Sequence, residues 1–592
     1  MNSTAGGKVM EGQILEYGDL IIAYLEQLGV EYVFGIPGGA IEPFYNALAR
    51  SERRGGPRAI VARHETGAAF MADGYSRNTG KLGVCCATTG PGATNLITGV
   101  ASAYENHIPM LVITAQTALS TFGRGAMQDS SCTGVNTVEL LHYCTRYSTL
   151  ISHVEQFEHK LTTAIMTAFS SPMGPVHISV PMDIMRQRQT AMASSFSLTN
   201  LVRKPALCDE DAVNKLYGEL VSARQPVFLL GDEAREAVGS ILTLAVKLNA
   251  RVIVTPHGKG LVSPYHPLFR GVISFAGHRE ANQILADEAV DRIFIIGANM
   301  GEWASNGWDS RLFGHRIIHI ESTEANLART PMAALHVRGR IETIVERTLM
   351  RLDANTDGRA PKALRVAPST EESRRHFTLD DEEKYYSDAI PIKPQRLMRE
   401  LPRVLPSNTY YLADSGASLS WAIHYLHPYD RRMSGRRDGS GGLFHAVTEF
   451  ASMGWAIGSA VGAALARPGD PVACITGDGS MLMSGQEITV AIQEKLPVIF
   501  VVLNDSAYGM VKHGQRMTGA ESIGTELPET DFAAFARAMG AEAHVIRSPG
   551  DLLALDGKAI ANRRGPTLLD VRIDPDEAPP IGFRTSFLKP AG

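Results

Sequence analysis

One short pattern occurs twice in this 592-residue chain, once toward each end of the sequence. In the first copy an apolar run leads to Thr89 and a Gly-Pro-Gly turn, and in the second an apolar run leads to Thr476 and a Gly-Asp-Gly turn. A proline that opens a further apolar run follows the turn by 19 residues at Pro109 and by 20 residues at Pro497. Strand, glycine turn, helix and strand are the parts of a parallel α/β unit. We therefore expect two related α/β domains with a different domain inserted between them; because such units are common, a chance match is the alternative.

Apolar strands alternate with helical stretches through three blocks of the chain. This alternation predicts parallel sheets that are covered by helices on both faces. We expect an α/β fold of three consecutive doubly wound parallel-sheet domains, at residues 12–185, 205–352 and 390–575, with a polar linker at 353–389. The clearest strands are expected at residues 83–87, 110–114, 176–179, 227–230, 251–254, 292–296, 316–320 and 498–503.

Charge and composition narrow the classes of function. The chain has 57 Lys and Arg against 62 Asp and Glu, a formal net charge of −5, which does not favour nucleic acid or an anionic membrane as a partner. The longest apolar runs have the length of strands and are too short to span a membrane. The six cysteines contain no C-x-x-C pair, which is typical of reduced thiols. No targeting segment is apparent in the first thirty residues. We expect a cytoplasmic enzyme that acts on small molecules.

The second glycine turn carries residue types that suit a metal ion. Asp478 follows one predicted strand, and the next predicted strand ends in Asn504 and Asp505, the latter 27 residues after Asp478. Neighbouring parallel strands bring their carboxyl ends to one edge of the sheet, so these side chains are expected to meet there. Carboxylate, amide and carbonyl oxygens, together with phosphate and water, favour Mg²⁺ over zinc. The alternative is a purely structural turn.

Four motifs, in family order, resemble those of the thiamine diphosphate enzymes. Segments 33–39, 63–75 and 89–95 resemble the opening turn, the activating-glutamate segment and the following loop of the pyrimidine domain in that family. The Gly-Asp-Gly turn and the later Asn-Asp pair resemble the metal–diphosphate signature, although Asp505 stands where most relatives have asparagine. Within the superfamily the likeness is strongest to the acetohydroxyacid (acetolactate) synthases.

The resemblance implies a pyrimidine-binding N-terminal domain, a central domain and a diphosphate-binding C-terminal domain. It implies thiamine diphosphate and Mg²⁺ as cofactors, and a homodimer or homotetramer with active sites at the subunit interface. The coenzyme acts as its C2 carbanion, which no protein group is basic enough to generate directly. By resemblance, Glu65 hydrogen-bonds the pyrimidine N1′, so that the coenzyme's own 4′-nitrogen can take the C2 proton. The alternative is a structural role for Glu65 as a helix cap or as the ion-pair partner of Arg63.

The resemblance also assigns the ligands of the coenzyme and the metal. The side chains of Asp478 and Asp505 and the backbone carbonyl of Ala507 become Mg²⁺ ligands, and Asp505 adds a negative charge beside the diphosphate. Met453 becomes an apolar wedge under the coenzyme, with an ordinary core methionine as the alternative. The residues expected to contact the coenzyme are Glu65, Gly416, Ala417, Ser418, Ala451, Met453, Gly477, Asp478, Gly479, Ser480, Asp505, Ala507, Tyr508, Gly509 and Met510.

The substrate side of the site is expected in the N-terminal domain. Gln128 matches a family loop that lies near the reacting carbons, and its side chain is expected to donate a hydrogen bond to the developing alkoxide. The backbone N–H of Gly39 is expected to reach the same oxygen, and an amide in a surface loop is the alternative for Gln128. Lys512, His513 and Arg516 place cationic groups near the presumed mouth of the site. They favour an acceptor that carries a carboxylate or is larger; the alternative is a solvated basic face.

The middle block resembles only in part the domain that carries FAD in acetohydroxyacid synthases. Gly231 is followed by Asp232 and Glu233 rather than by the usual glycines, so bound FAD and an empty site stay as alternatives. We predict decarboxylation of a 2-oxo acid, pyruvate, with transfer of the two-carbon unit to a carbonyl acceptor, as in acetolactate synthase. The rivals are an FAD-using enzyme like pyruvate oxidase, another thiamine-dependent decarboxylase or lyase that takes a different 2-oxo acid, and a non-catalytic paralogue.

Overall fold

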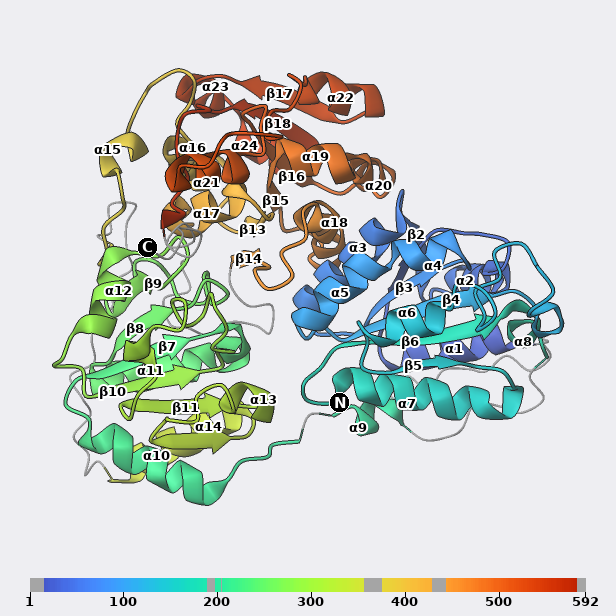
Figure 1. Ribbon diagram of the computed structural model, residues 1–592, viewed down its shortest axis with the longest axis horizontal. Helices are drawn as coiled ribbons and strands as arrows, with labels where there is room; N and C mark the ends of the chain where they lie inside the picture. The colour runs from blue at the N-terminus through green and yellow to red at the C-terminus, as the bar shows by residue number, and fades with distance from the viewer. Residues whose placement is uncertain (1–14, 189–196, 204, 356–374, 429–442, 583–592) are drawn as a thin grey trace. The chain divides into compact units, whose positions relative to one another are not determined.

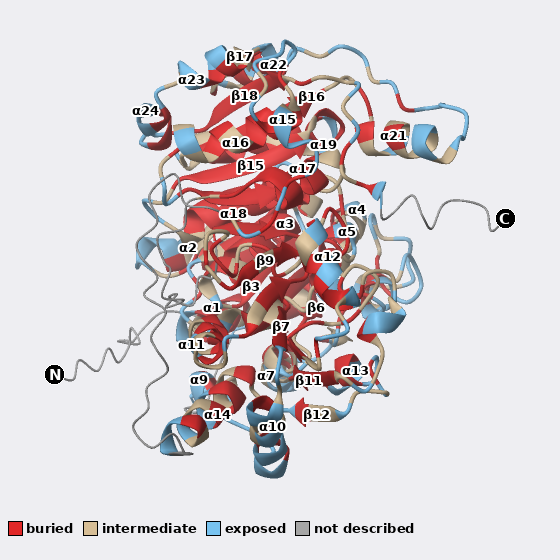
Figure 2. Ribbon diagram, turned by 90° about the vertical axis from the view of Figure 1, so that its left-hand side faces the viewer, coloured by how far each residue is buried: buried red, intermediate tan, exposed pale blue. Residues whose placement is uncertain are grey.

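A computed structural model describes residues 15–188, 197–203, 205–355, 375–428 and 443–582. Three six-stranded sheets follow one another along this part of the chain, and all their pairings are parallel (Figure 1). Helices cover the sheets, and most residues of the strands are buried (Figure 2). The predicted α/β class with three doubly wound parallel sheets is confirmed.

The first sheet has the strand order β2-β1-β3-β4-β6-β5. Every residue of β4 and β6 is buried, which explains why both strands are continuous apolar runs rather than alternating ones. The strands are β1 (Tyr32–Gly35), β2 (Arg58–Val61), β3 (Gly83–Ala87), β4 (Met110–Gln116), β5 (Ser148–Leu150) and β6 (Pro175–Pro181). The helices are α1 (Tyr17–Gln27), α2 (Glu42–Arg53), α3 (Glu65–Thr79), α4 (Pro91–Asn95), α5 (Ile97–Glu105), α6 (Thr137–His142), α7 (Phe157–Phe169), α8 (Met182–Met185) and α9 (Leu198–Leu201).

The third sheet has the order β14-β13-β15-β16-β18-β17, which is the order of the first sheet with each strand renumbered. A backbone detail also repeats. His107 and Lys495, each two residues before the proline of the repeated pattern, both have left-handed backbones, with φ of 55° and 56°. The internal duplication inferred from the sequence therefore extends to strand order and turn geometry. The strands are β13 (Tyr410–Ala413), β14 (Phe444–Ala446), β15 (Val472–Gly477), β16 (Val498–Asn504), β17 (Glu542–Ile546) and β18 (Thr567–Arg572).

The middle sheet has a different order, β12-β11-β10-β7-β8-β9. Its first strand, β7, lies in the centre, so the chain changes direction between β7 and β10, as in dinucleotide-binding folds. The strands are β7 (Pro226–Leu230), β8 (Arg251–Val254), β9 (Phe269–Val272), β10 (Arg292–Ile296), β11 (Ile317–Glu321) and β12 (Leu335–Arg338). The α-helices of this block are α10 (Glu210–Ser222), α11 (Val238–Leu248), α12 (Arg279–Ala286), α13 (Glu324–Leu327) and α14 (Ile341–Asn355).

The remaining helices surround the third sheet or precede it. Within this group α18 is buried on all sides: eleven of its twelve residues, from Trp455 to Leu465, are buried. The helices are α15 (Glu382–Tyr385), α16 (Pro394–Val404), α17 (Ala417–Tyr425), α18 (Trp455–Ala466), α19 (Asp478–Ser484), α20 (Ile488–Gln493), α21 (Gly509–Thr518), α22 (Phe532–Met539), α23 (Pro549–Leu553) and α24 (Gly557–Ala561).

By its contacts the chain forms two compact units. The first comprises residues up to 72 together with 81–203, and the second comprises 73–80 together with the chain from 204 onward. The end of α3 therefore belongs to the second unit, where it packs on α18. A Cβ atom on Gly74 would lie 2.2 Å from the carbonyl oxygen of Ser459, so only glycine permits this close approach.

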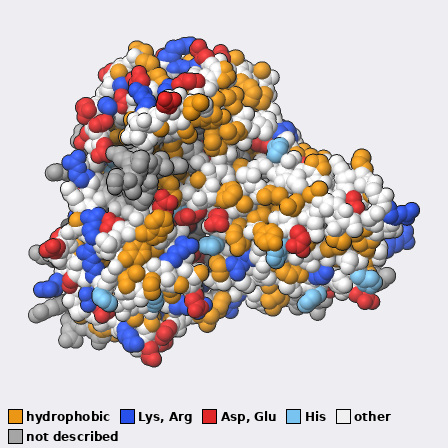
Figure 3. Space-filling view, viewed as in Figure 1, with side chains coloured by type: hydrophobic (Ala, Val, Ile, Leu, Met, Phe, Trp, Pro, Cys, Tyr) orange, Lys and Arg blue, Asp and Glu red, His pale blue; other side chains and the backbone are white. Residues whose placement is uncertain are grey.

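The hydropathy of the helices and the charges on one face describe the outside of the molecule. Within the described residues, every helix is too short or too polar to cross a lipid bilayer. Acidic and basic side chains are interspersed on the face drawn in Figure 3.

Candidate active site

In the second unit, three neighbouring strands of the third sheet end at one edge and lead directly into helices. β13 pairs with β15 and β15 pairs with β16. After these strands, α17 begins at Ala417, α19 at Asp478 and α21 at Gly509. The first backbone N–H groups of such helices have no partners within the helix. The topology thus gathers three helix starts, which favour negative charge, at the carboxyl end of the sheet.

Two carboxyl groups meet at this edge, as their positions after neighbouring strands predict. Asp478 is 3% exposed, and its carboxylate accepts hydrogen bonds from the N–H of Gly479 (2.7 Å) and of Ala507 (3.3 Å). Burial raises the pKa of Asp478 to about 6. Burial and the charge of Asp478 together raise the pKa of Asp505 to about 7. A cation between the two groups would offset the unfavourable ionisation of these buried carboxyl groups, so the pair suits a divalent metal.

The sequence also predicted Asn504 at this edge, but its side chain forms hydrogen bonds away from the carboxyl pair. Its amide donates to the carboxylate of Asp570 (2.9 Å) and to the carbonyl of Thr530 (3.0 Å). The loop that follows is held by backbone hydrogen bonds from Tyr508 to Thr525 and from Leu527 to Ser506, both 2.8 Å. Asn504 therefore anchors the metal loop, while Asp505 faces Asp478.

Asp414 fixes the segment that contains Met453, a role the sequence did not reveal. This fully buried carboxyl group accepts hydrogen bonds from the N–H of Gly454 (2.8 Å), the N–H of Ala456 (3.0 Å) and the hydroxyl of Thr476 (3.1 Å). Burial raises its pKa, and the hydrogen bonds oppose that shift. Asp414 thus ties the ends of β13 and β15 to the start of α18.

The glycines of this edge divide into two kinds. A Cβ atom on Gly479 would lie 2.6 Å from the Tyr508 ring, and a Cβ on Gly509 would lie 2.6 Å from Oδ2 of Asp505, so both glycines are required by protein packing. Gly416 and Gly477 have no heavy atom within 4 Å of the corresponding position. These two glycines therefore border open space at the starts of α17 and α19.

The hydroxyl groups at this edge also divide into two kinds: some have no hydrogen-bond partner, and one is bonded within the protein. The buried hydroxyls of Ser452 and Ser480 have no hydrogen-bond partner among the described residues. The hydroxyl of Ser418 instead donates to the carbonyl of Asp414 (2.9 Å), so this side chain is used within α17. Two orphaned hydroxyls, two open glycines and a carboxyl pair fit a ligand that carries phosphates and a metal ion.

The first unit holds a second cluster, where the segments after β2 and β3 meet; β1 lies between these two strands in the sheet. Glu65 opens α3 after β2 and is 8% exposed. Its Oε2 accepts a hydrogen bond from the amide of Asn95 (3.0 Å) at the end of α4. Its Oε1 lies 3.2 Å from the position that a Cβ on Gly92 would occupy. The motif around Asn95 was recognised in the sequence, but this contact to Glu65 was not.

Gln128 and Gly39 belong to loops of the same unit. Gln128 is exposed and has a left-handed backbone, with φ of 60°, and its carbonyl accepts a hydrogen bond from the Thr89 hydroxyl (2.8 Å). Its Cβ lies 3.0 Å from the position of a Cβ on Gly90, so the Gln128 loop rests on the repeated glycine turn. Gly39 borders open space, with no heavy atom within 4 Å of a Cβ position.

The three cationic residues that the sequence placed at the mouth of the site are engaged. Lys512 pairs with Glu526 (3.1 Å) and Arg516 with Asp576 (3.4 Å). His513 is buried, with 4% of its surface exposed. Lys512 and Arg516 are thus already paired with carboxylates, which fits a solvated basic face for these two, while the choice of acceptor stays a prediction.

The carboxyl end of the middle sheet does not fit a dinucleotide. A Cβ on Gly231 would lie 2.1 Å from the carbonyl oxygen of Gly297, so the loops after β7 and β10 touch at the point where the chain changes direction. Ser322 donates from its hydroxyl to Glu233 and from its N–H to Glu321, both at 2.7 Å. Burial and the charge of Glu321 raise the pKa of Glu233 well above its usual value. A pyrophosphate here would meet a closed crevice and a pair of carboxyl groups.

Asp478 and Asp505 together provide only two side-chain ligands for a metal ion. Among the described residues, no group of three or more His, Cys, Asp or Glu side chains is arranged to hold a metal. A metal at this edge would therefore depend on backbone and ligand oxygens, which suits Mg²⁺.

Three family descriptions match the chain, one for each sheet. Residues 15–135 match the thiamine pyrophosphate enzyme N-terminal TPP binding domain. Residues 213–348 match the central domain of the same enzymes, and residues 414–571 match their C-terminal TPP binding domain. The two carboxyl-end clusters fall in the two TPP binding domains.

Whole-chain comparisons agree. The chain is 30% identical to the acetolactate synthase isozyme 3 large subunit of Escherichia coli (strain K12), covering 95% of this chain and 96% of that protein. It is 29% identical to the isozyme 1 large subunit, covering 94% of each. Its fold is similar to the X-ray structure of a protein from Mycobacterium smegmatis described as thiamin diphosphate-dependent, with a TM-score of 0.72, 22% identity and coverage of 94% and 99%. The chain therefore belongs to the thiamine pyrophosphate enzymes and is an acetolactate synthase-like enzyme of that family.

Proposed function

We propose that this enzyme decarboxylates a 2-oxo acid, pyruvate, and transfers the remaining two-carbon unit to a carbonyl acceptor. The observation that carries the proposal is the edge of the third sheet, where two facing carboxyl groups lie beside open glycines and orphaned hydroxyls. Bound thiamine diphosphate supplies the carbanion chemistry that such a reaction needs. The residues of the chain bind it, orient it and control its protons.

The second unit is proposed to hold the metal and the diphosphate. Asp478 and Asp505 bind Mg²⁺ through their carboxylates, and Ala507 binds it through its carbonyl. Both carboxyl groups titrate near neutrality without a metal, so a cation draws them into the charged form. The diphosphate occupies the space in front of Gly416 and Gly477, where the starts of α17 and α19 donate N–H groups. The other residues proposed to contact the coenzyme are Ala417, Ser418, Ala451, Met453, Gly479, Ser480, Tyr508, Gly509 and Met510.

The orphaned hydroxyl of Ser480 is the side-chain donor proposed for the diphosphate. Met453 is proposed as the apolar support of the coenzyme. Its methyl group lies 3.4 Å from the position of a Cβ on Gly479, and Asp414 holds the loop that follows it. The side chain of Met453 is flexible, whereas the backbone that follows it is held in place by Asp414.

The first unit is proposed to hold the proton-transfer and substrate groups. Glu65 shares a proton with the coenzyme's pyrimidine ring, and Asn95 fixes the orientation of its carboxyl group by a hydrogen bond. Gln128 and the backbone N–H of Gly39 hold the oxygen of the reacting carbonyl group. The open space at Gly39 and the exposure of Gln128 leave room for a substrate.

The FAD-dependent alternative is disfavoured by the residues of the middle sheet. Support comes from the Gly231–Gly297 contact and the Glu233–Glu321 pair, which lie at the carboxyl end of the middle sheet, where dinucleotide-binding folds hold their ligand. We therefore propose a carboligase that works without flavin, rather than an enzyme like pyruvate oxidase.

Assembly and location complete the proposal. We propose a homodimer or homotetramer with active sites at the subunit interface, and we keep the domain division at 12–185, 205–352 and 390–575 as a proposal. All six cysteines lie in the described residues and are free, in keeping with the cytoplasmic location that we propose.

The test is mass spectrometry of products from the purified enzyme with thiamine diphosphate, Mg²⁺ and pyruvate, alone and with a panel of carbonyl acceptors. We expect CO₂ release together with a product that has two more carbons than the acceptor from which it forms. When pyruvate is both donor and acceptor, this product is 2-acetolactate. A parallel panel of other 2-oxo acids tests the choice of donor. Conversion of another 2-oxo acid but not of pyruvate would overturn the assigned donor, and consumption of oxygen with pyruvate would favour the oxidase.

A further inference from the structure

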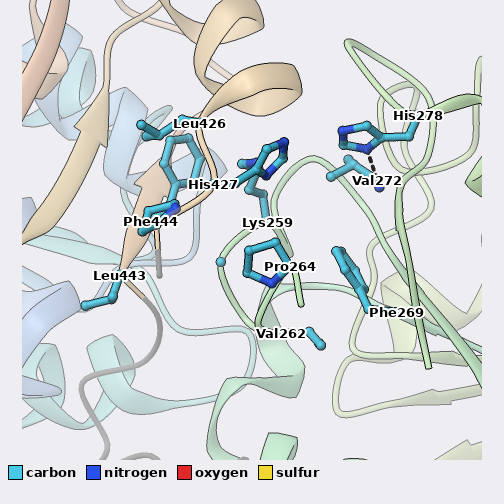
Figure 4. A pocket seen from close by; sticks show the side chains of 12 residues that line it. Lys259, Val262, Pro264, Phe269, Val272, His278, Leu426, His427, Leu443 and Phe444 are labelled. Carbon is cyan, nitrogen blue, oxygen red and sulfur yellow. Dashed lines mark hydrogen bonds between the residues drawn. The ribbon is translucent and has the colours of Figure 1, made fainter. Parts of the chain in front are cut away.

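A small cavity lies within the second unit, between loops of the middle sheet and the start of β14 (Figure 4). Its volume is about 30 Å³. A buried water needs roughly 10–15 Å³, so the cavity has room for two or three waters or for a very small organic molecule. Most of its wall is apolar, including Phe269 and Phe444, and three basic side chains also line it: Lys259, His278 and His427. In Figure 4, Lys259 and His427 lie between Phe444 and His278.

Lys259 is buried because its loop is pressed against β14. The neighbouring Gly260 has φ of 87°, and a Cβ there would lie 2.9 Å from Cβ of Phe444. Lys259 is 7% exposed, and its ammonium lies 5.8 Å from the centre of the Phe444 ring. Among the described residues this ammonium makes no hydrogen bond or ion pair. Burial and the charge of Arg375 lower its pKa to about 7. A buried ammonium of this kind is costly unless an anion accompanies it.

The hydrogen bonds of His278 and His427 determine which of their ring nitrogens can donate to a ligand or accept from it. His278 accepts from the N–H of Val272 at Nδ1 (3.0 Å) and donates to the carbonyl of His424 from Nε2 (3.1 Å), so both of its nitrogens are used. His427 donates from Nε2 to the same carbonyl (2.9 Å). Because a carbonyl only accepts, the proton of His427 is on Nε2 and its Nδ1 is an acceptor. Burial keeps the pKa of both rings well below the usual value.

The cavity thus presents one cationic donor, at Lys259, and one neutral acceptor, at Nδ1 of His427, within apolar walls. We propose that it binds a short 2-hydroxy carboxylate, whose carboxylate pairs with Lys259 and whose hydroxyl donates to Nδ1 of His427. A plain carboxylate would leave Nδ1 unsatisfied, and an amine would face the ammonium. A ligand with both an anionic acceptor and a hydroxyl donor satisfies both groups and also neutralises the charge of Lys259.

This site is separate from the proposed coenzyme site. α17 begins at the coenzyme edge, beside Gly416, and its nine residues end next to the histidine cluster. Nine helical residues span about 13 Å. The binding proposal therefore does not depend on the proposed reaction, and it is tested by binding rather than by turnover.

The test is calorimetric titration of the full-length protein with glycolate and with acetate. We expect glycolate to bind at least about tenfold more tightly than acetate, because only glycolate pairs with Nδ1. Lys259→Met removes the donor at nearly constant volume and is expected to weaken both ligands at least about tenfold. Lys215→Met, at an exposed position on α10, is the matched control and is expected to leave both affinities unchanged. His427→Phe is expected to weaken glycolate to the level of acetate.

Proton uptake provides a measurement that needs no variant. Burial and the charge of Arg375 lower the pKa of Lys259 to about 7, so pairing with a carboxylate is expected to take up more protons at pH 8 than at pH 6. Titration in two buffers that differ in ionisation enthalpy measures this number. Lack of saturable glycolate binding, equal binding by Lys259→Met and Lys215→Met, or equal affinity of the wild-type protein for acetate and glycolate would overturn the proposal. Absence of proton uptake at pH 8 would overturn the role of Lys259.

Discussion

Replacing Gly477 by alanine separates coenzyme binding from folding. The backbone of Gly477, at φ −89° and ψ 163°, is one that any residue adopts, and no heavy atom lies within 4 Å of an added Cβ. A glycine-to-alanine change at such a position stabilises a protein by about 0.4–1 kcal/mol, because it restricts the unfolded chain. Without coenzyme, the unfolding temperature of the variant should therefore equal or exceed that of the wild-type protein.

The same methyl group would enter the space proposed for the diphosphate. Overpacking of this kind costs about 1–3 kcal/mol. Since about 1.4 kcal/mol is a factor of ten, the dissociation constant for thiamine diphosphate should rise by about 5- to 140-fold. Calorimetric titration with the coenzyme at saturating Mg²⁺ measures this change.

Gly218→Ala is the matched control for Gly477→Ala. Gly218 lies in α10 of the middle block and also has no heavy atom within 4 Å of a Cβ position. Its replacement should stabilise the protein and leave coenzyme affinity unchanged. If Gly477→Ala folds normally and binds the coenzyme as tightly as Gly218→Ala does, the diphosphate does not lie in front of Gly477, and the reasoning is refuted.

Three further predictions follow from the packing and from the two carboxyl-end clusters. Gly74→Ala should lower the free energy of unfolding by about 3 kcal/mol, because its Cβ would lie 2.2 Å from the backbone oxygen of Ser459. A denaturant titration measures this, and a change below about 0.5 kcal/mol would contradict the packing. Chelation of divalent metal should weaken coenzyme binding. Asp478→Asn should weaken it more than Asp505→Asn, because the metal–diphosphate signature that this segment resembles has asparagine at position 505; the reverse order would contradict the ligand assignment. Protein incubated with FAD and then desalted should release no flavin fluorescence on denaturation, and stoichiometric flavin would show that the middle sheet accepts a dinucleotide after all.

Buried parallel strands were the most predictable part of the fold. The predicted strands at 83–87, 251–254 and 292–296 coincide with β3, β8 and β10. Each is a short apolar run between turn residues, and such runs stand out because both faces are buried. Short edge strands such as β5 (Ser148–Leu150) were not predicted, since its residues are only half-buried and its sequence does not differ from that of a loop. The equal strand order of the outer sheets followed from the repeated turn.

Sequence spacing could bring together only residues whose strands are neighbours. The meeting of Asp478 with Asp505 follows from the pairing of β15 with β16. The contact of Asn504 with Asp570 was not predicted, although both lie on the paired strands β16 and β18, because only side-chain geometry decides whether Asn504 turns toward Asp570 or toward Asp478. The hydrogen bond from Asn95 to Glu65 is of the same kind. Such contacts depend on the orientation of individual side chains, which no local sequence pattern records.

The role of Glu65 is the central claim, and exchange of the coenzyme's C2 proton tests it most directly. Glu65→Gln keeps the size of the side chain and an oxygen that can accept from Asn95, so coenzyme affinity should stay near that of the wild-type protein. Proton exchange at C2 of the bound coenzyme, followed by NMR after dilution into D₂O, should slow by at least about 100-fold. A Glu65→Gln protein that binds the coenzyme and exchanges this proton at the wild-type rate would contradict the account.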